Sequence, residues 1–345
     1  MQNVSIKFYL FLIVMFSQQQ TVFAKTKVVG YLPAYKGLLE NVNTAQLMKL
    51  THLNIAFINP DKSGNFFSGK QFTCTNTKYV QKLSKKELDE AIALAHQADV
   101  LVSFSIGGAL MPPCAGNWRS LIQPESLDKT VDGLIQIVDD FNLDGLDFDI
   151  ESKLLTGMIK DNNYLPFIQS LSKKLKKRNK ILSAATGSYQ GGMISTVSLP
   201  YFDYVSLMSY DAIGPTWGQA GVEHATIEQS RRDITLWLER GLKKEQLVLG
   251  LPLYGYGFGK YHANYSFALI MSEFRQSTKR EDLIGNACAG CDYITYNGPI
   301  TIAAKTNLAL KKGSGVMVWE LTQDTKDSSS LLHIINESLL QRTAN

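Results

Sequence analysis

Short apolar stretches recur along the chain and alternate with longer segments in which apolar residues repeat with a helical period. Eight of the short stretches have the length and the β-branched or aromatic content of strands: residues 27–32, 52–58, 100–106, 145–151, 181–186, 204–210, 247–254 and 315–321. In the segments between them, apolar residues return at i, i+3, i+4 and i+7, as in residues 88–95 and 131–138. The pattern therefore predicts strands that alternate with amphipathic helices.

Two local signals refine this pattern. Ser84 stands before the first helical segment and Glu87 follows three residues later, which is the spacing of a capping box at a helix N-terminus. The longest irregular part is residues 256–299, between the seventh and eighth predicted strands. We expect one helix there, around residues 266–276, and interpret the segment as a short insertion rather than as a second domain.

The alternation of eight strands with helices implies that the strands pair in parallel and can close into a barrel. We therefore predict an α/β chain with the (β/α)8 TIM-barrel fold. An open, doubly wound sheet is the alternative. It is disfavoured because the first strand leads into Gly30-Tyr31-Leu32-Pro33 rather than into a Gly-x-Gly-x-x-Gly turn.

The composition agrees with one large globular domain. The 345 residues are 45% hydrophobic and 19% charged, which is enough apolar material for a sizeable core. The net charge is +4, and the one dense basic run, residues 173–178, falls on a predicted helix, where a solvated face is the simplest interpretation. We expect a monomer without a nucleic-acid partner or a membrane association.

The N-terminus has the pattern of a secretory signal. Lys7 precedes an unbroken apolar stretch, residues 8–16, which is too short to span a bilayer, and small residues end the segment at Ala24. We therefore expect a cleaved signal peptide over residues 1–24 and one folded domain over residues 25–345. The expected location is secreted or periplasmic.

Export changes the interpretation of the four cysteines. An even number of cysteines in an oxidising compartment favours disulfides, and three pairings are possible. We expect Cys74 to pair with Cys114 and Cys288 to pair with Cys291. The alternative for Cys288 and Cys291 is half of a redox or zinc site, although a second Cys or His pair at metal spacing is lacking.

Acidic residues concentrate on the fourth predicted strand. Because side chains alternate along a strand, Asp147, Asp149 and Glu151 share one face, and the bulky apolar residues between them share the other. In a barrel the apolar face packs on the helices and the acidic face points inward. Three carboxylates inside a barrel repel one another and lose hydration, which indicates that a function requires them.

The position of Glu151 indicates acid catalysis. Active sites of (β/α)8 barrels lie at the C-terminal ends of the strands, and Glu151 is the last acidic residue of its strand. Negative neighbours and partial burial are expected to raise its pKa, which suits a general acid supported by Asp149. The alternative is a solvated acidic strand at a sheet edge, but it does not explain the bulky apolar residues that alternate with the acidic ones. An EF-hand loop fails as well, because Ser152 and Met158 stand where it needs Gly and Glu.

The acidic strand, which reads DGLDFDIE from Asp144 to Glu151, resembles the Asp-x-x-Asp-x-Asp-x-Glu signature of glycoside hydrolase family 18, the chitinases and their relatives. Three further segments resemble family motifs in the same order along the chain: Ser105-Ile106-Gly107-Gly108, Met208-Ser209-Tyr210-Asp211 and the Trp-bearing Val316-Met317-Val318-Trp319-Glu320. The resemblance extends from Gly30 to about Thr322.

This resemblance implies hydrolysis of β-1,4 bonds between N-acetylglucosamine units of chitin or chito-oligosaccharides, without a metal or cofactor. The family is an exception to the usual two-carboxylate scheme, because the substrate's own acetamido group is the nucleophile. By resemblance, Glu151 is the general acid and base, and Asp149 hydrogen-bonds the acetamido N–H. Asp147 shares a proton or hydrogen bond with Asp149, and Tyr210 holds the acetamido carbonyl.

The resemblance also implies a set of substrate-binding residues around the same pocket: Tyr31, Phe57, Gly107, Gly108, Met208, Asp211 and Trp319. Trp319 is expected to form the floor beneath the sugar, and a core Trp is the alternative. For Tyr31 and Phe57 the alternative is simple barrel packing. Four aromatic residues are candidates for further sugar-stacking platforms on the loops, with simple packing as the alternative: Trp118, Trp217, Tyr254 and Tyr256.

The short insertion predicts a shallow groove and endo cleavage. Two other functions share parts of the pattern. One is an endo-β-N-acetylglucosaminidase that cleaves the chitobiose core of N-glycans, although the segment Met208 to Asp211 favours a chitinase. The other is a non-catalytic chitin-binding lectin, against which the intact Glu151 argues.

Overall fold

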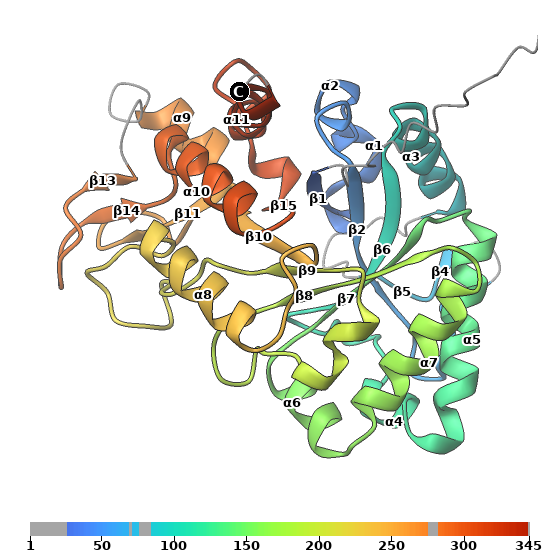
Figure 1. Ribbon diagram of the computed structural model, residues 1–345. Coiled ribbons are helices and arrows are strands. Elements are labelled where there is room, and N and C mark those ends of the chain that lie inside the picture. Colours follow the sequence, from blue (N-terminus) through green and yellow to red (C-terminus); the bar gives the residue numbers. More distant parts are fainter. Residues whose placement is uncertain (1–25, 69–70, 76–83, 275–281, 344–345) are drawn as a thin grey trace, which may run out of the picture.

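The structure is a computed structural model, and it describes residues 26–68, 71–75, 84–274 and 282–343 (Figure 1). The predicted signal peptide over residues 1–24 lies outside the described residues. None of the described helices is long and apolar enough to cross a membrane.

Eight parallel strands form the centre of the molecule: β1 (Lys27–Pro33), β2 (His52–Asn59), β6 (Leu101–Gly108), β7 (Gly145–Ile150), β8 (Ile181–Thr186), β9 (Tyr204–Leu207), β10 (Leu247–Pro252) and β15 (Gly315–Trp319). Strand β1 pairs with both β2 and β15, which closes the sheet into a barrel. The predicted fold is confirmed. Predicted strands 145–151 and 204–210 are too long at their C-terminal ends, because the chain leaves the sheet before Glu151 and before Met208.

Helices surround the barrel in Figure 1: α3 (Lys85–Gln97), α5 (Pro124–Asp140), α7 (Tyr164–Lys176), α8 (Ile227–Glu239), α10 (Pro299–Lys312) and α11 (Leu331–Thr343). The predicted capping box is present at α3, where the Ser84 hydroxyl accepts from the Glu87 N–H at 3.2 Å. The connection from β8 to β9 departs from the alternation. A 3-10 helix, η2 (Thr196–Tyr201), takes the place of an α-helix there.

The alternating pattern of β7 divides its side chains between the helices and the barrel interior. Phe148 is fully buried and packs against Tyr164 and Phe167 of α7, at ring-centroid distances of 5.6 and 6.3 Å. Asp147 and Asp149 point to the other side and are also buried. The predicted orientation of the acidic face is confirmed, and its chemistry is therefore directed at the barrel interior.

The insertion between β10 and β15 contains more regular structure than the sequence predicts. It forms an antiparallel sheet of β11 (Tyr254–Phe258), β12 (Asn264–Ser266), β13 (Leu283–Gly285) and β14 (Tyr293–Thr295), together with helix α9 (Phe267–Phe274). The expected helix is present, but the expectation of an otherwise irregular segment is wrong. The insertion is a small α+β unit.

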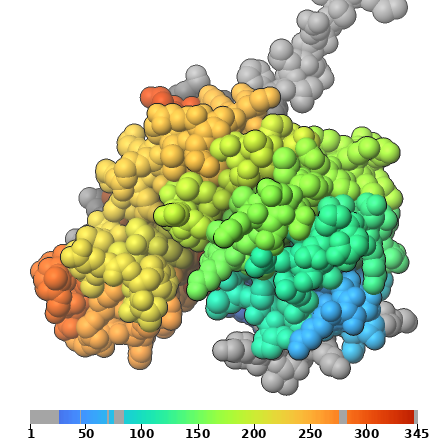
Figure 2. All heavy atoms as spheres, turned by 90° about the horizontal axis from the view of Figure 1, so that it is seen from below, coloured from blue at the N-terminus to red at the C-terminus, as the bar shows by residue number. Residues whose placement is uncertain are grey.

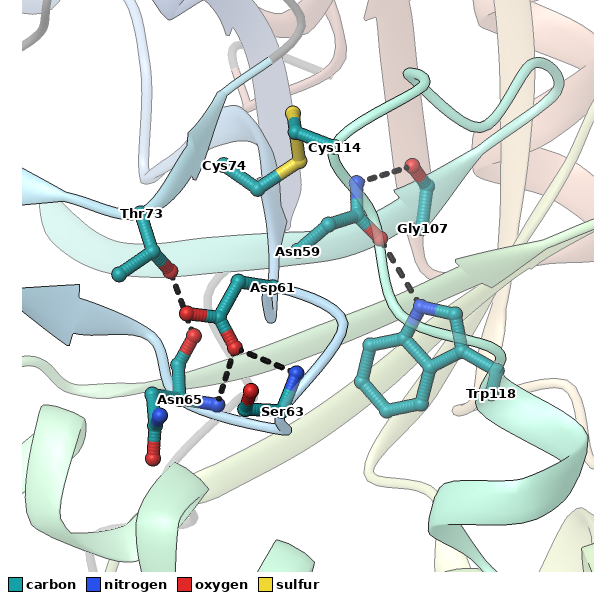
Figure 3. The surroundings of a disulfide bond; sticks show 9 residues. All are labelled: Asn59, Asp61, Ser63, Asn65, Thr73, Cys74, Gly107, Cys114 and Trp118. Atoms are coloured by element: carbon teal, nitrogen blue, oxygen red, sulfur yellow. Dashed lines mark hydrogen bonds between the residues drawn. A yellow bond between two sulfur atoms is a disulfide. The ribbon is translucent and has the colours of Figure 1, made fainter.

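Both predicted disulfides are present. Cys74 of β5 (Cys74–Thr75), a short strand antiparallel to β2, is bonded to Cys114 in the segment after β6 (Figure 3). Beside this bond, Asn59 donates to the Gly107 carbonyl oxygen at 2.9 Å and accepts from the Trp118 indole N–H at 2.9 Å. These contacts fix the ends of β2 and β6 to each other.

The second disulfide joins Cys288 to Cys291 within the insertion. It closes a turn in which the Cys291 N–H donates to the Cys288 carbonyl oxygen at 3.0 Å. The alternative of a zinc half-site is not supported, because both sulfur atoms are used in this bond.

Candidate active site

The acidic face of β7 opens into a pocket at the C-terminal end of the barrel. Seen from below in Figure 2, the surface is hollowed between a yellow-to-orange part and a green-to-blue part. The pocket has a volume of about 270 Å³ and is lined by thirteen residues, most of which follow or end barrel strands: Tyr31, Tyr35, Phe57, Ala109, Leu110, Asp149, Glu151, Ala185, Met208, Tyr210, Asp211, Met317 and Trp319.

Asp147 lies beneath the pocket and is fully buried. Its oxygens accept hydrogen bonds from Tyr31 Oη at 2.6 Å, Ser183 Oγ at 2.6 Å and Ser105 Oγ at 2.7 Å. Burial raises the pKa of Asp147, and the three hydrogen bonds oppose that rise. The expected hydrogen bond to Asp149 is not among these contacts, because the two serines stand beside Asp147 in register on β6 and β8.

Asp149 lies two residues after Asp147 on β7, on the same face of the strand, and lines the pocket. It is 3% exposed, and its Oδ1 atom has no hydrogen-bond partner. Burial raises the pKa of Asp149 well above its ordinary value, and the negative charges of Glu151 and Asp147 raise it further. A buried acceptor without a partner is uncommon in folded proteins. Here it is available to an N–H group of a bound molecule.

Glu151 follows the end of β7 and stands at the N-cap position of helix α6 (Ser152–Lys160), without a capping hydrogen bond from its side chain. The next residue, Ser152, has a φ of 59°, in the left-handed region that residues other than Gly seldom adopt. Such a backbone conformation costs about 1–3 kcal/mol and persists only where the surroundings enforce it. The turn directs the Glu151 side chain to the pocket instead of continuing the strand.

The protonation of Glu151 is matched to acid–base chemistry. Burial raises the pKa of Glu151 to about 7, the negative charge of Asp211 adds to this rise, and a hydrogen bond from Tyr189 opposes it. That bond joins Tyr189 Oη to Glu151 Oε2 at 3.2 Å. A carboxyl group with a pKa near neutrality can both give and take a proton, as a general acid and base must.

Aromatic rings form one wall of the pocket. Trp319 is partly exposed there, with Phe57 stacked on it at a centroid distance of 5.6 Å and Tyr31 edge-on at 5.5 Å. The alternative of a Trp buried in the core is therefore not supported. A ring of this kind offers an apolar face to a sugar.

Gly107 and Gly108 stand where strand β6 passes closest to these residues, with φ values of 107° and 97°. A Cβ atom on Gly107 would lie 2.7 Å from the Asp149 carbonyl oxygen, and one on Gly108 would lie 2.8 Å from the Phe57 ring. The register of β2 on β6 skips Phe57, which marks a β-bulge. The two glycines are required for this close approach, and neither lines the pocket itself.

The segment after β9 supplies the facing wall. Met208, Tyr210 and Asp211 line the pocket, and Asp211 has a φ of 60°. Tyr254 Oη donates to Asp211 Oδ1 at 2.5 Å and so fixes that side chain. Burial raises the pKa of Tyr210 well above its ordinary value, and nearby carboxylates raise it further, so the Tyr210 hydroxyl remains a hydrogen-bond donor.

Other residues of the site were not predicted. The lining includes five positions that were not among the predicted site residues: Tyr35, Ala109, Leu110, Ala185 and Met317. Tyr189 also went unnoticed, because it lies in an irregular segment without periodicity. A search for glycine-rich turns directly after barrel strands would have singled it out.

The aromatic residues considered as sugar-stacking platforms differ in exposure. Trp118 is fully buried, and Tyr254 and Tyr256 are 8% and 7% exposed, so these three rings are part of the packing. Trp217 is 44% exposed, and its indole N–H donates to the Asp211 carbonyl oxygen at 3.1 Å. Of these four, it alone presents a ring face to solvent.

The arrangement can perform acid–base chemistry on an uncharged substrate. It combines a carboxyl group that titrates near neutrality, a buried carboxyl group with an unpartnered oxygen, a phenolic donor and an aromatic wall. Within the described residues, no group of three or more His, Cys, Asp or Glu side chains is placed to hold a metal ion.

Comparisons with known proteins place the chain in a family. The family model described as "Glycosyl hydrolases family 18" matches residues 25–324. The crystal structure of the GH18 chitinase ChiB from the chitin utilization locus of Flavobacterium johnsoniae is 30% identical, with 92% of this chain and 95% of that chain covered and a TM-score of 0.77.

More distant relatives extend the comparison. Probable chitinase 10 of Drosophila melanogaster is 24% identical over 288 residues, which are 68% of this chain and 12% of that protein. Two further curated relatives are covered over 53% and 56% of their lengths. The fold is shared with the class V chitinase of Nicotiana tobaccum in complex with NAG4, at 19% identity, a TM-score of 0.73, and coverage of 91% of this chain and 99% of that chain.

Proposed function

Because the chain belongs to glycosyl hydrolase family 18, we propose that it is a chitinase that hydrolyses β-1,4 bonds between N-acetylglucosamine units, with Glu151 as general acid and base. The chain is a chitinase-like glycosidase by its family and relatives. One observation carries the finer proposal. Glu151, with a pKa of about 7, stands in one pocket beside Asp149, a buried carboxyl group with an unpartnered oxygen.

In the proposed first step, the protonated Glu151 carboxyl gives its proton to the glycosidic oxygen, and the bond from that oxygen to the anomeric carbon breaks. The carbonyl oxygen of the substrate's own acetamido group attacks the anomeric carbon and forms an oxazolinium ion. An internal nucleophile needs only to be held in place, so the protein's task is orientation and charge stabilisation.

Asp149 and Tyr210 supply that orientation. The unpartnered Asp149 Oδ1 accepts the acetamido N–H, which satisfies the buried oxygen and places negative charge beside the developing cation. The Tyr210 hydroxyl donates to the acetamido carbonyl oxygen. Asp147, held by three hydroxyl groups, keeps Asp149 from turning away into the barrel.

In the proposed second step, the ionised Glu151 takes a proton from water, and that water attacks the anomeric carbon from the face that the leaving group vacated. The oxazolinium ring opens and the acetamido group is restored. Two inversions at the same carbon give retention of configuration. Trp319 forms the floor under the sugar ring, and Asp211, held by Tyr254, contacts the sugar at the scissile bond.

Chitin or its oligomers are the proposed substrate. The bound NAG4 of the Nicotiana tobaccum structure supports this choice, because that chain has the same fold. We further propose that residues 1–24 are a signal peptide, that the protein acts outside the cytoplasm, and that it works as a monomer. The mass of the protein recovered from culture medium or periplasm checks the cleavage after Ala24.

One experiment separates this proposal from its rivals. The purified protein is given chitotetraose and, separately, a high-mannose glycopeptide, and the products are followed by mass spectrometry and by proton NMR of the anomeric signals. We expect chitotetraose to be cleaved with the β-anomer formed first. Cleavage of the glycopeptide alone would make the chain an endo-β-N-acetylglucosaminidase. Binding of chitotetraose without any cleavage would make it a lectin.

A further inference from the structure

The turn that follows β8 places an aromatic residue beside Glu151. It has the sequence Gly187-Ser188-Tyr189-Gln190-Gly191-Gly192. The Gly187 N–H donates to the Gly192 carbonyl oxygen and the Gly192 N–H donates to the Tyr189 carbonyl oxygen, both at 3.0 Å. The turn is therefore closed on itself by its own backbone.

The Tyr189 ring lies directly over two of these glycines. A Cβ atom on Gly192 would lie 2.3 Å from the ring's Cζ, and one on Gly187 would lie 2.5 Å from its Cε1. In both cases the nearest atoms all belong to the Tyr189 ring. The ring thus occupies the space that side chains at these positions would fill, so this orientation of the ring requires the two glycines.

The turn is also anchored to the barrel's outer layer. Trp237 of α8 is fully buried, and its indole N–H donates to Ser188 Oγ at 3.2 Å. Ser188 is the residue before Tyr189. The backbone beside Tyr189 is therefore attached to helix α8, while Tyr189 itself is 51% exposed.

The hydroxyl of this ring reaches the catalytic carboxyl group, with Tyr189 Oη 3.2 Å from Glu151 Oε2. Burial raises the pKa of Tyr189 to about 12, and the charge of Glu151 adds to this rise. The phenol is therefore protonated throughout the range in which Glu151 titrates. It is a permanent donor toward a group that must alternately hold and release a proton.

We propose that Tyr189 is a positioning residue, held by the Gly187–Gly192 cradle, that orients the Glu151 carboxyl group toward the scissile bond. The proposal rests on the role of Glu151 proposed above. By fixing one carboxyl oxygen, Tyr189 leaves the other to face the glycosidic oxygen, which lowers the number of side-chain conformations that must be abandoned on reaching the transition state.

The contact is first tested without any substrate. Glutamate labelled with 13C at the carboxyl carbon is incorporated, and the Glu151 signal is assigned by its loss in Glu151→Gln and titrated. The hydrogen bond favours the ionised carboxyl, so Tyr189→Phe is expected to raise the pKa of Glu151 by about 0.5–1 unit. Tyr201→Phe is the matched control, because Tyr201 bonds to Gln169 instead. An unchanged Glu151 titration in Tyr189→Phe would overturn the proposal.

Kinetics on chitotetraose then test the positioning. Tyr189→Phe is expected to lower kcat about threefold to tenfold with little change in KM, and to move the basic limb of the pH profile to higher pH. A change in KM with an unchanged kcat would contradict the positioning role of Tyr189. A basic limb at the same pH as in the wild type would contradict it as well. If the wild type does not cleave chitotetraose, the proposed function fails, while the carboxyl titration still decides whether the contact exists.

The cradle gives an independent test by a double-mutant cycle. Gly192 does not have a left-handed φ, so the backbone tolerates Gly192→Ala, and the three atoms nearest to the added Cβ all belong to the tyrosine ring. We expect Gly192→Ala to lower kcat in the wild type and to have no further effect in a Tyr189→Ala background. Equal effects in the two backgrounds would show that Gly192 does not act through Tyr189.

Discussion

Glu151 and Asp149 are carboxyl groups that lose hydration when the chain folds, and both have raised pKa values for that reason. Groups arranged for catalysis commonly reduce the stability of the fold that carries them. At this site, the buried Asp149 lacks a partner for one oxygen, and Ser152 and Asp211 have left-handed backbone conformations. Several residues that form the site therefore destabilise the folded state.

This cost predicts a pH-dependent effect of Glu151→Gln on stability. The folded pKa of about 7 lies above the ordinary value of 4.5, so ionisation of Glu151 opposes folding. The penalty is absent below about pH 4, develops as the pH rises from 4.5 to 7, and is complete above. We expect Glu151→Gln to melt about 2–4 °C higher than the wild type at pH 8 and at the same temperature at pH 4, by calorimetry. Equal melting temperatures at both pH values would contradict the raised pKa.

At the scale of single residues, sequence reasoning succeeds where a period exists. The two-residue alternation along β7 is sufficient to place Asp147 and Asp149 on the inner face. It does not indicate what Asp147 contacts, because its partners Ser105 and Ser183 come from two other strands whose register the sequence leaves open. Tyr189 could not be predicted for a related reason, since its position depends on the fold of one glycine-rich turn.

At the scale of elements, two disulfides of very different span stabilise the loops around the barrel. Cys74 and Cys114 are 40 residues apart in the sequence, whereas Cys288 and Cys291 are 3 apart. The first bond connects the segment after β2 to the segment after β6, next to the Asn59 contacts of Figure 3. It therefore restrains the unfolded chain much more than the second bond does.

This difference predicts unequal losses when each bond is removed. The loop-closure model gives a cost of about 4 kcal/mol for replacing Cys74 and Cys114 by Ala and about 1.5 kcal/mol for replacing Cys288 and Cys291. Urea unfolding of the two double variants, produced in the same compartment, measures both. A larger loss from the Cys288 and Cys291 pair would show that native contacts, and not restraint of the unfolded chain, dominate.

The limits of sequence reasoning at this scale follow from element length. The barrel strands show clear patterns, and their ends were predicted to within three residues. The strands of the insertion were not predicted, because strands such as β12 and β13 contain three residues each and are too short to show alternation. Its sheet depends on pairings between segments far apart in the chain.

At the scale of the whole molecule, the insertion decides the shape of the groove. It adds one sheet and one helix, and its Tyr254 donates to Asp211, which lines the pocket. The thirteen lining residues nevertheless leave the pocket open to solvent at the C-terminal face (Figure 2). We expect a pocket with such an opening to admit a long polymer without requiring a chain end.

This shape predicts endo cleavage. With chitohexaose labelled at its reducing end, we expect early products of several lengths, including trimers from central cleavage, when samples are analysed by mass spectrometry before a tenth of the substrate is consumed. Release of disaccharide alone from one end would show that the groove is closed at that side and would reject the endo assignment.

The role of Glu151 is tested most directly by kcat/KM for chitotetraose between pH 4 and pH 9, measured for the wild type, Glu151→Gln and the surface control Glu239→Gln. We predict a wild-type profile that falls as the pH rises through about 7, because Glu151 then loses the proton that the leaving group needs. The control should follow the wild type, and Glu151→Gln should be at least about a hundredfold slower throughout. Wild-type turnover in Glu151→Gln would contradict the assignment of Glu151 as the general acid.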